Sequence, residues 1–96
     1  MGKNPRRRQK RLGDKLLQVR RALGLSQNEM LQRLELGNDL SRTNISNYEL
    51  GQREPPLYVL LRCARVAGVC TDVLIDDGLV LPASVPGIPK HRAPRR

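Results

Sequence analysis

The sequence predicts a small all-α domain, a compact bundle of about five short helices with flexible basic arms at both ends. Three observations support this prediction. Apolar residues recur at spacings of three and four, signals for helix ends separate these segments, and almost no stretch alternates as a β-strand does. The 96 residues suffice for one domain with a thin core, which must be aliphatic because the chain has no Phe or Trp.

The first two expected helices are marked by apolar faces and by end signals. The first begins at Leu12 and ends before Gly24, since glycine favours helix ends. Its inward face consists of Leu12, Leu16, Val19 and Leu23. The second covers about 27–34, because Ser26 and Glu29 have the spacing of a capping box. Its expected inward residues are Met30, Leu31 and Leu34.

Three further helices follow a turn signal at residues 37–39, which read Gly-Asn-Asp. Ser41 is the expected cap of a third helix over about 42–50, with Ile45 and Tyr48 facing inward. The pair Pro55-Pro56 suits only the first turn of a helix. The apolar face of that fourth helix is expected at Leu57, Leu60, Leu61, Ala64 and Ala67, and Gly68 ends it. Thr71 is the expected cap of a last turn over 72–75.

The formal charge of +9 is concentrated at the two ends of the chain. All nine acidic residues lie within residues 12–81. The domain itself is expected over residues 12–78, and residues 79–96 form a tail that is first apolar and then rich in Pro and Arg. Residues 1–11 are expected to form a flexible arm, which either binds an anionic partner without sequence preference or serves solubility. Its basic residues are Lys3, Arg6, Arg7, Arg8, Lys10 and Arg11.

The composition argues against an enzyme, a metal site and a membrane protein. The only histidine is His91, and Cys63 and Cys70 are expected to be core or near-core thiols. No glycine-rich phosphate loop is present, so no cofactor or small-molecule ligand is expected. Neither a signal peptide nor an apolar run of roughly 18 to 20 residues is visible, and we therefore expect a cytoplasmic protein.

Several short segments occur in the order that is typical of one family. These are residues 16–20, 24–29, 40–46, 48–51, 54–56 and 64–69 (LLQVR, GLSQNE, LSRTNIS, YELG, EPP and ARVAGV). On these segments the span from Leu12 to about Ile75 resembles the lambda-repressor-like, Xre-type helix-turn-helix family. The resemblance implies a DNA-binding transcriptional regulator, of repressor type, from a prokaryote or phage.

In such a domain the third helix enters the major groove of DNA. Its outward face here carries no acid, and the expected base contacts are Arg42, Thr43, Ser46 and Asn47. Arg42 suits guanine, Asn47 suits adenine and Thr43 suits the methyl group of thymine. The expected phosphate contacts are Gln27, Asn28, Asn44 and Arg53. By resemblance, Arg20 and Glu49 form a structural ion pair.

Two features depart from the family pattern. The turn over 35–40 is roughly three residues longer than usual, and Leu31 stands where the family favours a small alanine. Both changes affect how the second and third helices approach each other, and therefore where the reading helix lies.

A single helix-turn-helix reads only a short site, so we expect a weak homodimer on an inverted repeat with half-sites about 10 base pairs apart. Its expected surface is about residues 73–81, which otherwise close the core. Two other functions stay open at this point. One is an antitoxin-like or other protein-binding domain that docks through Leu79, Val80, Leu81, Val85 and Ile88. The other is an RNA-binding or architectural protein driven by its arms.

Overall fold

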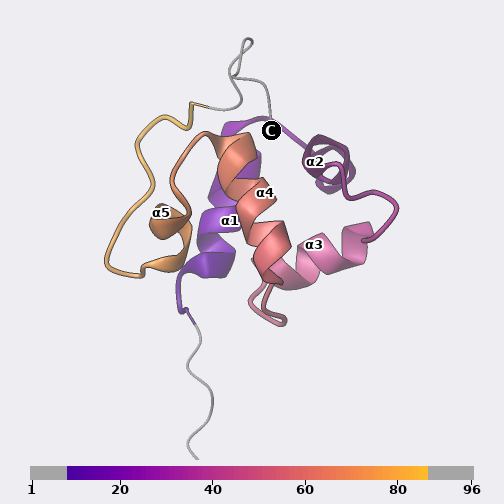
Figure 1. The fold of residues 1–96 in the computed structure, drawn as a ribbon, viewed down its shortest axis with the longest axis horizontal. Coiled ribbons are helices and arrows are strands. Elements are labelled where there is room, and N and C mark those ends of the chain that lie inside the picture. The colour runs from indigo at the N-terminus through magenta and orange to yellow at the C-terminus, as the bar shows by residue number, and fades with distance from the viewer. Residues whose placement is uncertain (1–8, 87–96) are drawn as a thin grey trace, which may run out of the picture.

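The computed structural model describes residues 9–86, and within them the predicted all-α fold is confirmed (Figure 1). The chain forms α1 (Leu12–Ala22), α2 (Gln27–Leu34), α3 (Arg42–Glu49), α4 (Leu57–Ala67) and α5 (Thr71–Ile75). No strand occurs among the described residues. No helix in this part of the chain has both the length and the apolar composition needed to cross a membrane.

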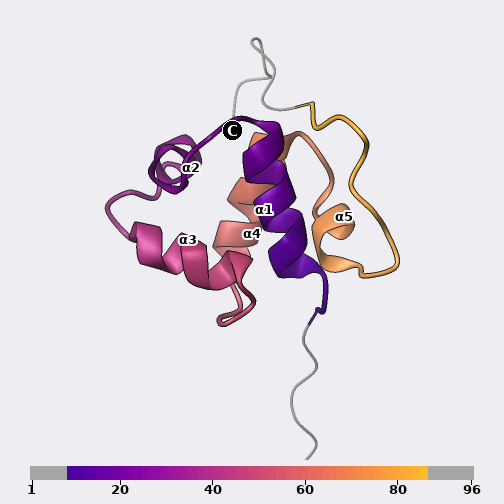
Figure 2. The same ribbon diagram turned by 180° about the vertical axis from the view of Figure 1, so that it is seen from behind.

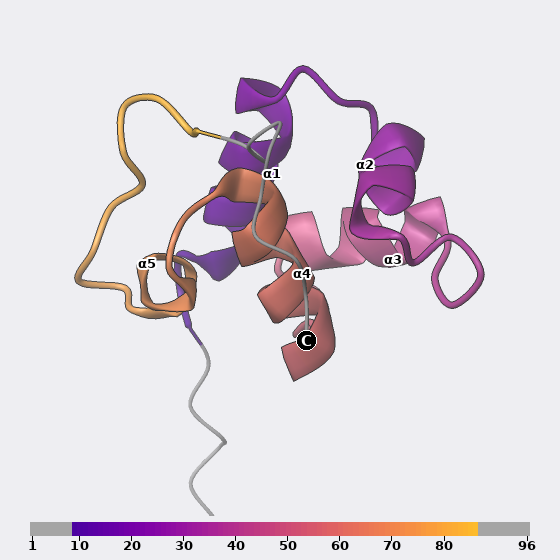
Figure 3. The ribbon, with the colours of Figure 1, turned by 45° about the horizontal axis from the view of Figure 1, so that its top comes forward.

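The helices are arranged around a central pair, α1 and α4. Figures 1 and 2 view this pair from its two sides, with α4 nearer the viewer in the first and α1 nearer in the second. The two views agree that α2 and α3 lie on one flank of the pair and α5 on the other. Figure 3 shows the connection between α2 and α3 looping outward from that flank. In this arrangement α1 packs against α3 and α5, and α4 packs against α2 and α5.

The core is aliphatic, as predicted, and Tyr48 is the one aromatic residue in it. Its buried members are Leu12, Leu16, Val19, Met30, Leu31, Leu34, Leu36, Ile45, Tyr48, Val59, Leu60, Cys63, Ala64, Val66, Ala67 and Leu74. Leu23, Leu25, Leu40, Val69, Ile75, Leu81 and Val85 pack against this cluster while partly buried.

The inward face predicted for α4 is wrong in part. Leu57 and Leu61 are exposed, whereas Val59, Cys63 and Val66 are buried with the predicted Leu60, Ala64 and Ala67. The reason is that α4 packs between α2 and α5, which buries a broad arc of the helix. Leu57 and Leu61 lie outside this arc. The expectation for the thiols is also half wrong, because Cys70 is exposed.

Helix ends differ from the expectation by one residue at three places. The first helix, α1, ends at Ala22, with Leu23 as its C-cap rather than its last residue. Leu50 is the C-cap of α3 rather than its last residue. Thr71 is the first residue of α5, whose N-cap is Cys70. The other helices end where their capping signals predict, with Gly68 in the left-handed conformation at the end of α4.

The segment after α5 is fastened to α1 at two points. The carboxylate of Asp77 accepts hydrogen bonds from the backbone N–H groups of Lys10 (2.9 Å) and Arg11 (3.0 Å), just before α1. These bonds lower the pKa of Asp77. The buried side chain of Lys15 donates through Nζ to the carbonyl oxygens of Val73 and Asp76, both at 2.7 Å, at the end of α5. The negative end of a helix is a favourable place for such a cation.

Candidate nucleic-acid interface

The outward face of α3 carries four side chains that can donate or accept hydrogen bonds. Arg42 and Thr43 are exposed, and Ser46 and Asn47 are half-buried one turn further along. None of the four side chains is engaged in a hydrogen bond or ion pair with another described residue. The only acid in α3, Glu49, is buried on the opposite side. This face therefore presents one positive charge and three neutral polar groups to solvent.

The N-terminus of α2 is held by the predicted capping box. Ser26 Oγ accepts from the backbone N–H of Glu29 at 3.0 Å, and Glu29 Oε1 accepts from the backbone N–H of Ser26 at 2.7 Å. The bonds to Ser26 lower the pKa of Glu29. Asn28 is exposed beside this cap, and the other backbone N–H groups of the first turn have no helical partner. This end of α2 is suited to bind an anion.

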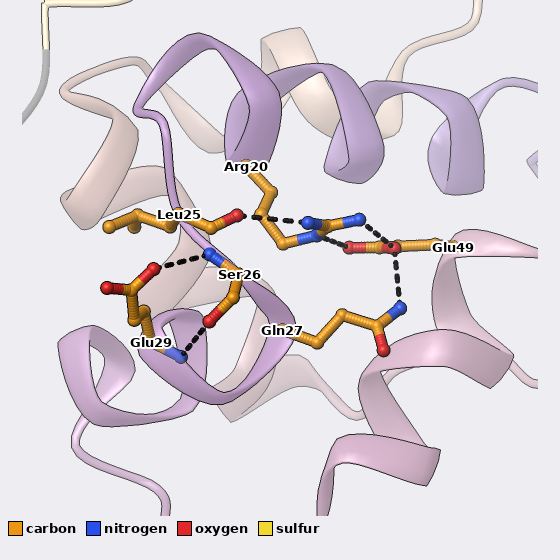
Figure 4. Close-up of polar contacts among 6 residues, drawn as sticks. All are labelled: Arg20, Leu25, Ser26, Gln27, Glu29 and Glu49. Atoms are coloured by element: carbon orange, nitrogen blue, oxygen red, sulfur yellow. Dashed lines mark hydrogen bonds and ion pairs between the residues drawn. The ribbon is translucent and has the colours of Figure 1, made fainter.

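Arg20, Glu49 and Gln27 form a linked polar cluster between α1, α2 and α3 (Figure 4). Arg20 donates from Nε to Glu49 Oε2 at 2.6 Å and from Nη2 to Glu49 Oε1 at 3.0 Å, a two-point ion pair. These hydrogen bonds raise the pKa of Arg20. Gln27 Nε2 also donates to Glu49 Oε1, at 3.2 Å, and Arg20 Nη1 donates to the carbonyl oxygen of Leu25 at 2.9 Å.

This cluster determines how two parts of the interface sit relative to each other. Glu49 is the last residue of α3, and Gln27 is the first residue of α2. The Glu49 carboxylate that binds the guanidinium of Arg20 also accepts the hydrogen bond from Gln27, so it links the end of α3 to the start of α2. Gln27, expected to meet a phosphate, is half-buried and uses its amide nitrogen within the protein. Its amide oxygen makes no hydrogen bond among the described residues.

The long turn between α2 and α3 is anchored on the core. Leu36 is buried, and its carbonyl oxygen accepts from the backbone N–H groups of Asp39 and Leu40. Glu35 adopts the left-handed conformation (φ 61°) that glycine favours at the end of a helix. Arg62 of α4 donates to the carbonyl oxygen of Leu34 at 2.7 Å and so satisfies the end of α2. The additional residues thus form an ordered loop beside the start of α3.

The residues predicted as phosphate contacts are in different situations. Asn28 and Arg53 are exposed, Arg53 in the connection between α3 and α4. Asn44 is half-buried, and its Oδ1 accepts from the backbone N–H of Ser41 at 2.8 Å and from Ser41 Oγ at 3.1 Å. Asn44 therefore caps α3, and only its amide nitrogen remains for another partner.

Gly13 is a positioning residue that the sequence analysis did not identify. A Cβ atom at this residue would lie 2.8 Å from the carbonyl oxygens of both Tyr48 and Glu49. The backbone of α1 can therefore approach the last turn of α3 only because residue 13 has no side chain. A glycine inside an otherwise amphipathic helix was the available signal, since it weakens a helix unless a close approach requires it.

Two other predicted elements lie at the ends of the described chain. In the basic arm, the backbone of Lys10 and Arg11 is bound by Asp77, while Lys3, Arg6, Arg7 and Arg8 lie outside the described residues. Within the predicted dimer segment, Leu74 is buried and Leu81 packs on the core, whereas Leu79 and Val80 are exposed. Val85 also packs on the core, and Ile88 lies outside the described residues.

Comparison with known proteins gives two matches to this domain. The chain is 36% identical over 64 residues to the HTH-type transcriptional regulator ImmR of Bacillus subtilis (strain 168), over 67% of this chain and 47% of that protein. The aligned part is thus less than half of the relative's length. No solved structure gave a significant match. The family model of the helix-turn-helix domain matches residues 11–77, most of the chain, and the protein therefore belongs to the helix-turn-helix family of the Xre-like type.

Proposed function

We propose that this protein is a sequence-specific DNA-binding transcriptional regulator, acting as a repressor, that reads the major groove with the outward face of α3. The observation that carries the proposal is that face: Arg42, Thr43, Ser46 and Asn47 are unengaged, and no acid lies among them. Such side chains match the donors and acceptors on base edges. Binding to an operator would place the protein in the cytoplasm with the nucleoid.

The neighbouring elements support the same reading. The start of α2 offers backbone N–H groups and Asn28 to a phosphate, and Arg53, in the connection after α3, offers a positive charge. Gln27 joins this set through its unused amide oxygen and its contact with Glu49, which fixes the side chain before DNA arrives. Phosphate contacts position the helix, and the four α3 side chains supply sequence preference.

The direct test is to select bound duplexes from a random DNA pool and to measure variants on the selected site. Arg42→Ala or Asn47→Ala should cost about 1 to 3 kcal/mol of binding free energy and relax the preference at one base position. Arg21→Ala is the matched control, because Arg21 is an exposed arginine of α1 outside this face. If Arg42→Ala weakens specific and random DNA equally while the fold is intact, α3 does not read bases in this way.

The contribution of the basic arm is tested through salt dependence. Deleting residues 1–8 removes Lys3, Arg6, Arg7 and Arg8 and keeps the two residues whose backbone Asp77 binds. The slope of log affinity against log salt should flatten by up to about 0.9 for each lost phosphate contact. An unchanged slope would show that these residues do not touch DNA.

We further propose that the regulator binds as a homodimer to an inverted repeat, with half-sites about 10 base pairs apart. One domain of this size covers a short site, and two copies on adjacent turns of DNA multiply the specificity. The competing antitoxin-like function requires a protein partner that docks on residues 79–85. In that segment Leu81 and Val85 pack on the core of this domain, which favours a structural role for them.

A further inference from the structure

A cleft of about 540 Å³ lies between the outward face of α1 and the segment that follows α5. We call this segment, residues 79–86, the strap. In Figures 1 and 2 the strap rises from the level of α5 to the end of α1, in the same direction as the helix. The cleft therefore lies on the α5 flank of the domain, away from α3. Its volume is that of a small-molecule site, which is usually about 300 to 1,000 Å³.

Both walls of the cleft are held in place by the rest of the domain. Asp77 fastens the chain just before the strap to the backbone just before α1, through the hydrogen bonds of 2.9 and 3.0 Å. Within the strap, Leu81 and Val85 pack on the core. The cleft is thus formed before any ligand arrives, as ligand sites usually are. Sequence alone does not reveal this cleft, because its walls come from the two ends of the described chain.

The two walls of the cleft differ in chemistry. The α1 wall is polar, and its charged members are three cations and one acid, Arg11, Lys15, Arg21 and Asp14. Val80 of the other wall is 72% exposed, so its side chain leaves water when the cleft is filled. The strap wall offers only apolar side chains, those of Val80, Leu81, Pro82, Ala83 and Val85. An occupant that suits both walls combines an anionic group with an apolar body.

Arg21 is the cation that remains available to such an occupant. Lys15 is engaged with two carbonyl oxygens at the end of α5, and the chain at Arg11 adjoins the carboxylate of Asp77. Arg21 is exposed, and its side chain makes no hydrogen bond or ion pair with another described residue. A planar guanidinium of this kind suits a carboxylate, which it can bind through two parallel hydrogen bonds.

We infer that this cleft binds a small organic anion, a carboxylate with an apolar body. The carboxylate accepts hydrogen bonds from Arg21 and from the amide of Gln18, which lines the cleft one turn earlier on the same side of α1. The apolar body lies against the strap. Asp14 is seven residues before Arg21, roughly 10 Å along the helix, so its repulsion of an anion at Arg21 is largely screened.

Charge and position disfavour the other occupants that are close at hand. The two ends of the chain, residues 1–8 and 87–96, lie outside the described part, and their charged side chains are all basic, so Arg21 disfavours them. DNA is anionic, but its backbone offers no apolar body to the strap, and the cleft lies away from α3 (Figures 1 and 2). The inference goes beyond the proposed function and is tested without DNA.

The test compares three probes on the full chain. Octanoate, below the concentration at which it forms micelles, carries both the charge and the apolar body. Octanol has the same chain without the charge, and acetate has the charge without the chain. In titrations followed by ¹H–¹⁵N spectra, octanoate should bind about tenfold or more tightly than either, because only octanoate uses both walls. The amide signals of residues 14–22 and 80–85 should shift most.

Variants then test each wall against a matched control. Arg21→Gln removes the charge from the cleft, and Arg65→Gln removes an exposed arginine of α4. Val80→Asp places an acid in the apolar wall, and Leu79→Asp places one on the neighbouring exposed residue, which does not line the cleft. The two cleft variants should each bind octanoate about 5- to 10-fold more weakly, and both controls should stay within about twofold of the wild type. Melting temperatures show whether the fold is intact.

The assignment is overturned if octanol binds as tightly as octanoate, if Arg21→Gln binds octanoate as well as Arg65→Gln does, or if the largest shifts fall outside the two walls. It is also overturned if another occupant already fills the cleft. Deleting residues 87–96 would then strengthen octanoate binding if the occupant is the end of the chain, and diluting the protein would strengthen it if the occupant is a second copy. None of these outcomes bears on DNA recognition by α3, so the proposed function is judged separately.

Discussion

Replacing Gly13 with alanine tests how closely α1 must approach the reading helix. Alanine is favoured over glycine inside a helix by about 1 kcal/mol, so helix propensity alone predicts a more stable protein. The structure predicts the opposite, because the new Cβ would lie 2.8 Å from the carbonyl oxygens of Tyr48 and Glu49. Ordinary contacts begin at 3.4 Å, so the last turn of α3 must retreat by about 0.6 Å.

Overpacking of this kind costs about 1 to 3 kcal/mol, and the net loss after the gain in helix propensity is up to about 2 kcal/mol. In a domain of this size each lost kcal/mol lowers the melting temperature by about 4 to 8 °C. Thermal and urea unfolding measure the effect, and Gly37→Ala is the control, since no atom lies within 4 Å of a Cβ there. The displaced α3 should also weaken binding to the selected duplex. A Gly13→Ala variant at least as stable as the wild type would refute the reasoning.

Three further predictions concern charges and thiols. Glu49→Gln should lower the free energy of unfolding by about 3 kcal/mol in urea denaturation, because the largely buried Arg20 loses its counter-charge. A decrease of less than about 0.5 kcal/mol would mean that water satisfies the Arg20 guanidinium instead. The folded-state pKa of Asp77 is lowered, so its stabilisation is present above the pKa of the unfolded carboxyl, about 3.9, and is lost as pH falls through the folded value. Asp77→Ala should therefore be less stable at neutral pH and equal to the wild type in strong acid, which melting curves across pH would show; a constant difference would contradict it. Burial raises the pKa of Cys63 to about 12, so a thiol reagent at neutral pH should modify only Cys70 in the native protein and both cysteines after unfolding.

The helix positions were predictable because their signals are local. Ser26 and Glu29 cap α2 through bonds within four residues, and the predicted range 27–34 is the observed one. Gly68 ends α4 for a similarly local reason, since it supplies the left-handed conformation there. The resemblance to the family, which rests on such segments and their order, is confirmed by the match over residues 11–77.

The covered side of α4 was not predictable from the same information. Apolar residues occupy most positions of this helix, including Val59, Cys63 and Val66, so periodicity alone allows more than one inward arc. Only the positions of α2 and α5 decide between them, and these depend on the whole fold. The exposure of Leu57 and Leu61 follows from that decision.

Lys15 and Gly13 illustrate a second limit. A lysine is expected at the surface, yet Lys15 is buried because the end of α5, 58 and 61 residues further along the chain, provides two carbonyl oxygens. The need for Gly13 likewise comes from α3. The base and phosphate contacts remain predictions, since their test requires DNA.

The contacts of Gly13, Arg20 and Lys15 make α1 the element through which the two ends of the domain are connected. On one side α1 holds the reading helix, through the close approach at Gly13 and the ion pair of Arg20 with Glu49. On the other side it holds the segment after α5, through Lys15 and through Asp77, which binds the backbone where the basic arm begins. Because the two attachments lie on one rigid helix, the starting point of the arm is fixed relative to α3. A loss at Asp77 should therefore weaken arm-dependent DNA binding while leaving the base preference of α3 unchanged.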